Sequence, residues 1–232
     1  QSPKPMPQLH ALLVGINTYD PRSNVRPLRG CHNDVKAIQQ LLKTQYTHLN
    51  PQIKVLKDQR ATREKLIQNF RKHLAAKAQA RDLVLFYFSG HGSRAEAAPA
   101  FRQLDSTGID ETLVCYDSRT PGKYDLADKE LAVLLSEVSS GVEVVVIIDS
   151  CHSGEMTKSI DADLNGRRSR FTSQVKGYRD LSTYLLSKDN YYTQQLATRQ
   201  DLQIPHRAHV VLGACGRDQE AWEADDDRGV FT

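Results

Sequence analysis

The chain lacks the long apolar run and the excess of one charge that would indicate a membrane or a nucleic acid as partner. Its strongest apolar stretch, 142–148, contains Glu143 and is far shorter than the ~20 residues of a membrane-spanning helix. The 31 basic and 28 acidic side chains leave a net charge of +3, which is too small to favour nucleic acid or an anionic membrane surface. We therefore expect neither partner.

Cysteine, glycine and proline are also scarce. Four cysteines in 232 residues do not make the dense disulfide framework of a small secreted protein, so we expect reduced thiols and a cytoplasmic location. With 13 glycines and 9 prolines, the chain is neither fibrous nor disordered in composition. No glycine-rich dinucleotide motif or phosphate loop occurs, which sets nucleotide binding aside.

What the sequence does contain is a set of short, continuous apolar runs typical of buried strands. Four are strong and a fifth, 53–56, is weaker. The strong runs are 9–16, 83–88, 142–148 and 209–214. A peripheral hairpin strand is expected at 111–116, before Pro121 and Gly122.

Helical periodicity fills the intervals between these strands. Apolar residues share one helical face in 35–42, 66–74 and 131–138. The resulting β-α-β-α-β-α-β order predicts an α/β fold in which helices cover both faces of an open parallel sheet. The stretch 155–206 interrupts this order; it is polar, carries a basic cluster at 166–170, and is expected to be a long functional insertion.

Two glycine-rich segments follow buried strands and carry candidate catalytic groups. His91 lies between Gly90 and Gly92 after one strand, and Cys151 follows the next strand. Because parallel strands end at one edge of the sheet, the thiol and the imidazole can meet there. Such a pair supports nucleophilic acyl transfer, with the backbone N–H groups of Gly92 and Cys151 as candidate oxyanion donors.

Other roles for these residues compete with catalysis. Cys115 and Cys215 are best interpreted as small buried residues. A zinc site is a second hypothesis, and an inactive scaffold that binds a partner or peptide is a third. The zinc ligands would be Cys31, His32, His91, Cys151 and His152.

The two glycine-rich segments, 89–92 and 149–154, resemble the catalytic motifs of metacaspases and their prokaryotic relatives, the orthocaspases. Segments 28–35, 110–112 and 214–220 extend the resemblance over most of the chain. It implies a caspase-hemoglobinase fold, which is a three-layer αβα sandwich around a mostly parallel six-stranded sheet. It also implies a cysteine endopeptidase with His91 and Cys151 as the catalytic pair.

The resemblance also suggests how the chain is divided. Residues 1–8 would be a linker, 9–154 the large-subunit part, 155–206 an insertion between the parts, and 207–232 the start of a small-subunit part. The last of these is expected to be incomplete at its C-terminal end.

Substrate preference can be argued from charge as well as resemblance. Asp34 opens the first helix and Asp149 ends a strand, so two carboxylates would line the cleft and attract a cation. By resemblance, Cys31, Asp34, Ser89 and Asp149 form the S1 pocket that binds Arg or Lys at the P1 position of a protein or peptide substrate. The alternative for Asp34 is a partner for the helix dipole.

Three further expectations follow from the resemblance. Self-cleavage would occur in the insertion, after Arg167, Arg168 or Arg170, unless this loop is simply solvated. The chemistry needs no cofactor, but calcium is a possible activator, with candidate ligands Asp105, Asp110, Glu111, Asp161 and Asp163. We expect a monomer.

Overall fold

A five-stranded parallel sheet forms the centre of the protein. The computed structural model describes residues 6–102, 104–151, 168–185, 190–214, 222–223 and 229. Within them the strand order is β2-β1-β3-β7-β9, with every neighbouring pair parallel. The strands are β1 (Leu9–Gly15), β2 (Gln52–Lys57), β3 (Leu83–Ser89), β7 (Glu143–Asp149) and β9 (Val210–Gly213).

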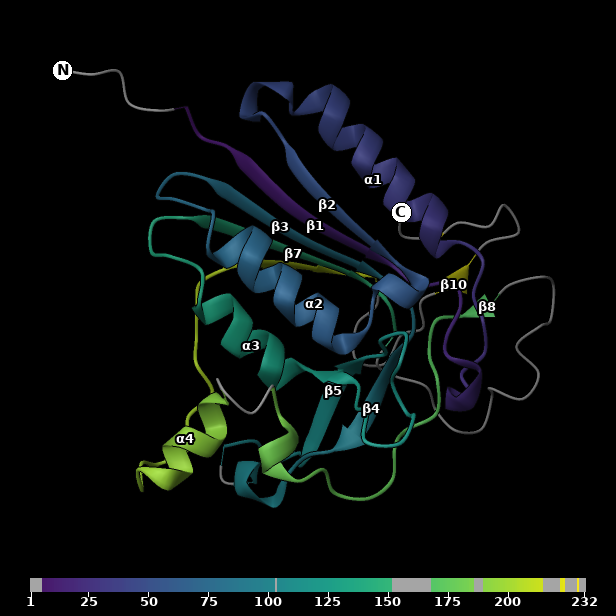
Figure 1. Ribbon diagram of the computed structural model, residues 1–232, viewed down its shortest axis with the longest axis vertical. Helices are drawn as coiled ribbons and strands as arrows, with labels where there is room; N and C mark the ends of the chain where they lie inside the picture. The colour runs from purple at the N-terminus through teal and green to yellow at the C-terminus, as the bar shows by residue number, and fades with distance from the viewer. Residues whose placement is uncertain are drawn as a thin grey trace.

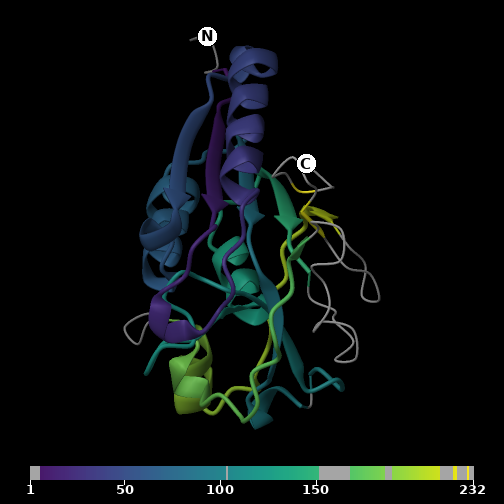
Figure 2. The same ribbon diagram turned by 90° about the vertical axis from the view of Figure 1, so that its right-hand side faces the viewer.

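Helices cover both faces of this sheet (Figures 1 and 2). Helix α1 (Cys31–Gln45) lies on one face, while α2 (Arg63–Asn69) and α3 (Asp128–Ser136) lie on the other. Alternate side chains of each strand enter opposite layers: in β1, Ala11 and Leu13 pack with α1, whereas Leu12 and Val14 pack with α2 and α3. Both layers are therefore built from the continuous apolar runs.

The remaining elements are short and peripheral. An antiparallel sheet has the order β4-β5-β6, and β8 pairs with β10. These elements are β4 (Gly92–Glu96), β5 (Ile109–Leu113), β6 (Leu126–Ala127), β8 (Arg168–Ser169), β10 (Trp222–Glu223) and α4 (Tyr191–Ala197). A π-helical turn, Phe70–Ala75, continues α2, and 3-10 turns lie at Pro21–Ser23, Thr47–Leu49, Asp58–Arg60, Pro99–Phe101 and Leu181–Thr183.

The architecture confirms the predicted α/β class and its three αβα layers. All five predicted strands of the central sheet and the three predicted helices are present, with ends shifted by a few residues. The described residues contribute five strands to the sheet, where six were expected. No helix in the described part of the chain is long and apolar enough to cross a bilayer.

The stretch 155–206 contains more packed structure than a polar insertion suggests. Its described parts, 168–185 and 190–206, include β8 and α4. Tyr184 and Tyr192 are fully buried, and their hydroxyls donate to the Asp110 carboxylate (2.5 Å) and the Lys129 carbonyl (2.7 Å). This part of the stretch is thus attached to the preceding part of the chain by buried tyrosines.

Candidate active site

The structure places His91 and Cys151 at the same edge of the sheet. They follow β3 and β7, whose last residues, Ser89 and Asp149, are paired in register. Both side chains are buried. The His91 ring is oriented by its Nε2 atom, which lies 2.8 Å from the Arg26 carbonyl. This acceptor favours the tautomer with a proton on Nε2 and a lone pair on Nδ1.

The protonation of His91 follows from its burial. Burial lowers the pKa of His91 to about 4, although the nearby carbonyls of Arg26 and Arg170 act in the opposite direction. The imidazole is therefore neutral at pH 7. Its Nδ1 atom has no hydrogen-bond partner within the described residues, which is the state that a general base requires.

Two backbone N–H groups, one from each predicted catalytic motif, converge on one carbonyl oxygen. Gly92 N and Cys151 N lie 2.9 Å and 3.3 Å from the carbonyl oxygen of Arg170. The approach depends on glycine, because a Cβ at position 92 would lie 2.0 Å from the Cys151 carbonyl oxygen. The predicted oxyanion donors thus hold the carbonyl of a predicted self-cleavage residue.

The side chain of the same arginine enters the predicted S1 pocket. Arg170 is fully buried. Its Nη2 lies 2.5 Å from Asp34 Oδ2, and its Nη1 lies 2.8 Å from Asp149 Oδ1. The Ser89 hydroxyl oxygen also accepts from Arg170 Nη1 at 3.0 Å. Asp34 lies in the first turn of α1, so it faces both the helix N-terminus and the guanidinium.

A third carboxylate, which the sequence did not reveal, completes the pocket. Glu223 Oε1 lies 3.4 Å from Arg170 Nη2, and the Glu223 carboxylate accepts hydrogen bonds from Arg29 N and Gly30 N, where α1 begins. Cys31 Sγ lies 3.8 Å from Glu223 Oε1. Burial raises the pKa of the Cys31 thiol to about 12, so this residue is a neutral lining group rather than a nucleophile.

Gly229 closes the pocket on the remaining side. Its N–H donates to Asp34 Oδ1 at 2.9 Å. A Cβ at this position would lie 2.4 Å from Asp149 Oδ2 and 2.7 Å from Arg170 Nη1. The space for a guanidinium therefore depends on the absence of a side chain here.

Residues on both sides of Arg170 lie in extended backbone across this edge. Before it, Arg168 and Ser169 form β8, which pairs antiparallel with Glu223 and Trp222 of β10; both short strands lie beyond the carboxyl ends of the central sheet (Figure 1). After it, Phe171 forms a parallel bridge with Gly92 of β4. We call residues 168–175 the threaded segment.

Of the other two self-cleavage candidates, the structure describes Arg168. Arg168 is only partly buried and its Nη1 donates to the Pro27 carbonyl at 3.2 Å. Arg167 lies outside the described residues.

The described residues proposed as zinc ligands have other partners in the structure. His32 Nε2 lies 3.0 Å from Asp58 Oδ2, and His91 Nε2 lies 2.8 Å from the Arg26 carbonyl. His152 lies outside the described residues. No group of three His, Cys, Asp or Glu side chains suited to a metal occurs within the described ranges.

Of the calcium candidates that the structure describes, Asp105 and Asp110 are paired with a lysine rather than left as a vacant pair. Asp105 Oδ2 and Asp110 Oδ1 both contact Lys129 Nζ, at 3.0 Å and 2.6 Å, so an ammonium already occupies the position between them. Asp161 and Asp163 lie outside the described residues. Calcium dependence stays a prediction.

A thiol, a neutral imidazole and paired N–H donors at the carboxyl edge of a parallel sheet form the kind of site used for thiol-dependent acyl transfer. Comparison with known proteins agrees with this class. Residues 9–160 match the family model described as metacaspase, peptidase C14 domain. The chain belongs to the metacaspase family of caspase-like cysteine peptidases.

Individual relatives support the same assignment. The chain is 34% identical over 151 residues to Metacaspase III c of Phaeodactylum tricornutum, covering 62% of this chain and 42% of the relative. It is 34% identical over 158 residues to Metacaspase-8 of Arabidopsis thaliana, covering 65% and 38%. The aligned region thus spans less than half of each relative.

A solved structure provides evidence on the fold alone. A protein of Geobacter sulfurreducens superposes with a TM-score of 0.65 at 24% identity, covering 97% of this chain and 78% of that chain.

Proposed function

We propose that this protein is a cysteine endopeptidase that cleaves after Arg or Lys and that it cleaves its own chain between Arg170 and Phe171. One observation carries the proposal. Arg170 has its guanidinium among three carboxylates and its carbonyl on two N–H donors. This is the position that the P1 residue of a substrate would occupy.

Each step of the reaction can be assigned to a group at this site. His91 Nδ1 accepts the proton of the Cys151 thiol, and the sulfur attacks the Arg170 carbonyl carbon. The negative charge that develops on the oxygen is stabilised by Gly92 N–H and Cys151 N–H. His91 then donates the proton to the Phe171 nitrogen, the peptide bond breaks, and a thioester between Cys151 and Arg170 remains. Water, deprotonated by His91, hydrolyses the thioester and releases the thiol.

The charge of the pocket supports a basic P1 residue. Asp34, Asp149 and Glu223 surround one guanidinium, so a neutral or acidic P1 side chain would leave buried carboxylates unpaired. An aspartate at P1 would add a fourth negative charge.

Occupation of the pocket by Arg170 also supports a latent form of the enzyme. Glu223 pairs with the arginine, Gly229 bonds the adjacent Asp34, and the arginine has no solvent exposure. A second substrate can therefore enter only after the threaded segment has left. Cleavage after Arg170 would cut the chain within this segment, so that each half could leave separately.

Mass spectrometry of the purified chain tests the proposal. We expect two fragments, the second beginning at Phe171. Cys151→Ala should keep the chain intact at 26.1 kDa, because loss of the nucleophile costs roughly six orders of magnitude in a serine peptidase. Cys115→Ala is the matched control, since Cys115 is likewise a buried thiol but has no role in the proposed reaction, so its loss should not affect cleavage.

Fluorogenic peptides test the substrate preference of the processed protein. Peptides with Arg or Lys at P1 should be hydrolysed and the matched Asp peptide should not, with and without calcium in parallel. Preference for Asp would contradict the role of the three carboxylates. Absence of both self-cleavage and peptide hydrolysis would favour the inactive scaffold.

A further inference from the structure

The residues that follow Arg170 lie along the outer edge of strand β4. Thr172 N donates to the Gly92 carbonyl at 3.1 Å and Val175 N donates to the Arg94 carbonyl at 2.9 Å. The bridges are parallel, and β4 pairs on its other side with β5. The threaded segment therefore adds one strand to the free edge of the β4-β5-β6 sheet.

Two side chains reinforce this edge. Ser93 is fully buried, and its hydroxyl oxygen lies 3.0 Å from the carbonyls of both Thr172 and Ser173. Arg119 Nη1 lies 3.4 Å from the Thr172 hydroxyl, while Arg119 Nη2 lies 3.2 Å from Asp125 Oδ2. The serine thus contacts backbone, whereas the arginine contacts a side chain.

Arg119 has unused capacity to bind an anion. Its Nε atom is buried and has no hydrogen-bond partner in the part of the chain that the structure describes. Asp125 holds the guanidinium in place but also accepts the Thr112 hydroxyl at 2.9 Å. A carboxylate in place of the Thr172 hydroxyl would give this guanidinium a stronger, charge-assisted acceptor.

We infer that the free edge of β4, with Ser93 and Arg119, is a binding site for the leaving-group side of substrates, and that it prefers an acidic residue at P2′. The inference rests on the proposed function, in which Arg170 is P1 and Thr172 is P2′. The ligand is an extended peptide that adds to β4 as a parallel strand, where backbone hydrogen bonds contribute affinity and Arg119 provides selectivity.

The site should act on substrates from other molecules because, after cleavage, only exchangeable edge contacts of the kind a substrate would make hold residues 171–175 on β4. The nearest buried ion pair of its own chain is at Arg179, whose guanidinium lies 3.0 Å and 2.9 Å from the two Glu130 oxygens. The new N-terminus at Phe171 can therefore leave the edge while residue 179 stays in place.

Kinetics with the self-processed chain test the inference. The substrates are internally quenched peptides with the sequence of residues 168–175 and Asp, Glu, Thr, Ala or Lys at P2′, and an Arg-aminocoumarin peptide that has no residues after P1. We expect kcat/KM to be about five- to tenfold higher for Asp than for Ala at P2′. Arg119→Met should bring this ratio close to one. Lys123→Met, in the same turn but half-exposed, should preserve it.

N-methylated peptides test the backbone contacts separately. Methylation of the P2′ nitrogen removes the hydrogen bond to the Gly92 carbonyl and should lower kcat/KM about two- to tenfold. Methylation at P3′ should have less effect, since Ser173 N makes no bond to β4. Hydrolysis of the coumarin peptide together with indifference to P2′ and to methylation would overturn this inference alone. Absence of hydrolysis of every peptide would overturn the proposed function and this inference with it.

Discussion

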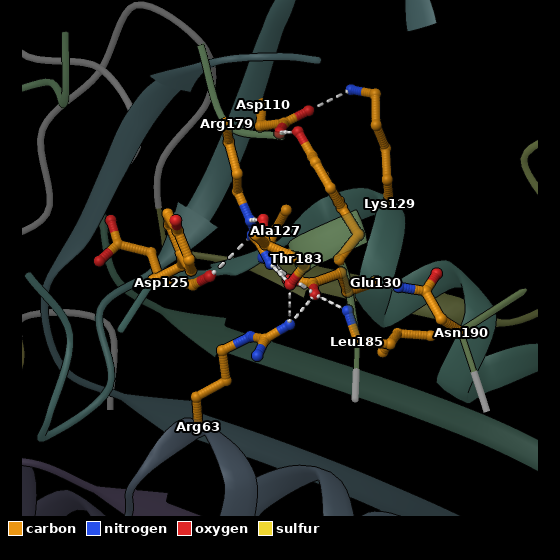
Figure 3. A network of polar contacts seen from close by, with 12 residues as sticks. Arg63, Asp110, Asp125, Ala127, Lys129, Glu130, Arg179, Thr183, Leu185 and Asn190 are labelled. Atoms are coloured by element: carbon orange, nitrogen blue, oxygen red, sulfur yellow. Dashed lines mark hydrogen bonds and ion pairs between the residues drawn. The ribbon is translucent and has the colours of Figure 1, made fainter. Parts of the chain in front are cut away.

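Two buried arginines in the insertion, Arg170 and Arg179, are held in opposite ways. Arg170 lies among three carboxylates, from Asp34, Asp149 and Glu223; we call these four residues the pocket cluster. Arg179 shares the single carboxylate of Glu130 with a second guanidinium, that of Arg63; we call these three the anchor cluster (Figure 3). One cluster has an excess of negative charge and the other an excess of positive charge.

The difference in charge explains why another cation could replace Arg170 in its cluster but not Arg179 in its own. If Arg170 leaves, three carboxylates remain close together, and another cation relieves their repulsion. Under the proposed function, we therefore expect the pocket cluster to bind a second basic side chain.

The contacts of the anchor cluster should persist after cleavage. Arg179 Nη2 also donates to the Thr183 carbonyl at 2.6 Å, and Glu130 accepts from Ala127 N and Leu185 N. Although burial alone would raise it, the charges of Arg179 and Arg63 hold the pKa of Glu130 below its ordinary value. Every group here has several partners, so this part of the insertion should stay bound after cleavage.

The anchor cluster should be the more sensitive to loss of a charge. In a Cys151→Ala background, which keeps the chain intact, Glu130→Gln leaves two buried guanidinium groups without an anion. We expect the free energy of unfolding in urea to fall by about 3–5 kcal/mol. The control is Glu137→Gln, because Glu137 pairs with Arg71 at the surface and should cost at most about 1 kcal/mol. Equal effects of the two substitutions would show that the cluster is not an anchor.

Mild acid should affect the active-site edge before it affects the anchor cluster. An unfolded histidine binds a proton near pH 6.5, whereas folded His91 does so only near pH 4. Its stabilising contribution is thus complete above pH 6.5 and is lost as the pH falls toward 4, by about 3 kcal/mol. The contribution of Glu130, whose pKa is lowered, is lost only at more acidic pH.

Urea unfolding of the Cys151→Ala chain between pH 7.5 and pH 4 measures this loss. The additional substitution His91→Asn should flatten the dependence in that window. An unchanged slope in the double variant would mean that other groups cause the pH dependence.

Parts of the molecule that depend on local pattern could be predicted from the sequence. The central strands are continuous apolar runs, and the glycine-rich ends of β3 and β7 carry His91 and Cys151. Parallel packing then brings these ends to one edge without further information. Asp34 and Asp149 could be named for the same reason, since both lie where a strand or helix meets that edge.

Two kinds of residue could not be predicted from the sequence: those that act through a main-chain group, and those placed by strand pairing between distant parts of the chain. The Arg26 carbonyl orients His91, but a main-chain acceptor has no signal in sequence. Glu223 reaches the pocket through the two-residue pairing of β10 with β8, which is too short to leave a periodic pattern. Strand β4 is mostly polar because it lies at an edge, so its sequence did not indicate a strand. The tyrosines of the insertion did indicate packed structure there, because Tyr184 and Tyr192 are buried.

The smallest expected effect concerns the shape of the cation in the pocket cluster. Arg170 bonds Asp34 through Nη2 and Asp149 through Nη1, and a single ammonium cannot match both directions of a planar guanidinium. Arg170→Lys should therefore slow self-cleavage about tenfold, or roughly 1.4 kcal/mol, measured as the rate at which the N-terminus at Phe171 appears. Arg170→Gln, which has no charge, should be slower still. If the Arg170→Lys variant is cleaved as fast as the parent chain, the pocket selects the P1 side chain by its charge alone. The directions of the two hydrogen bonds would then not matter for P1 selection.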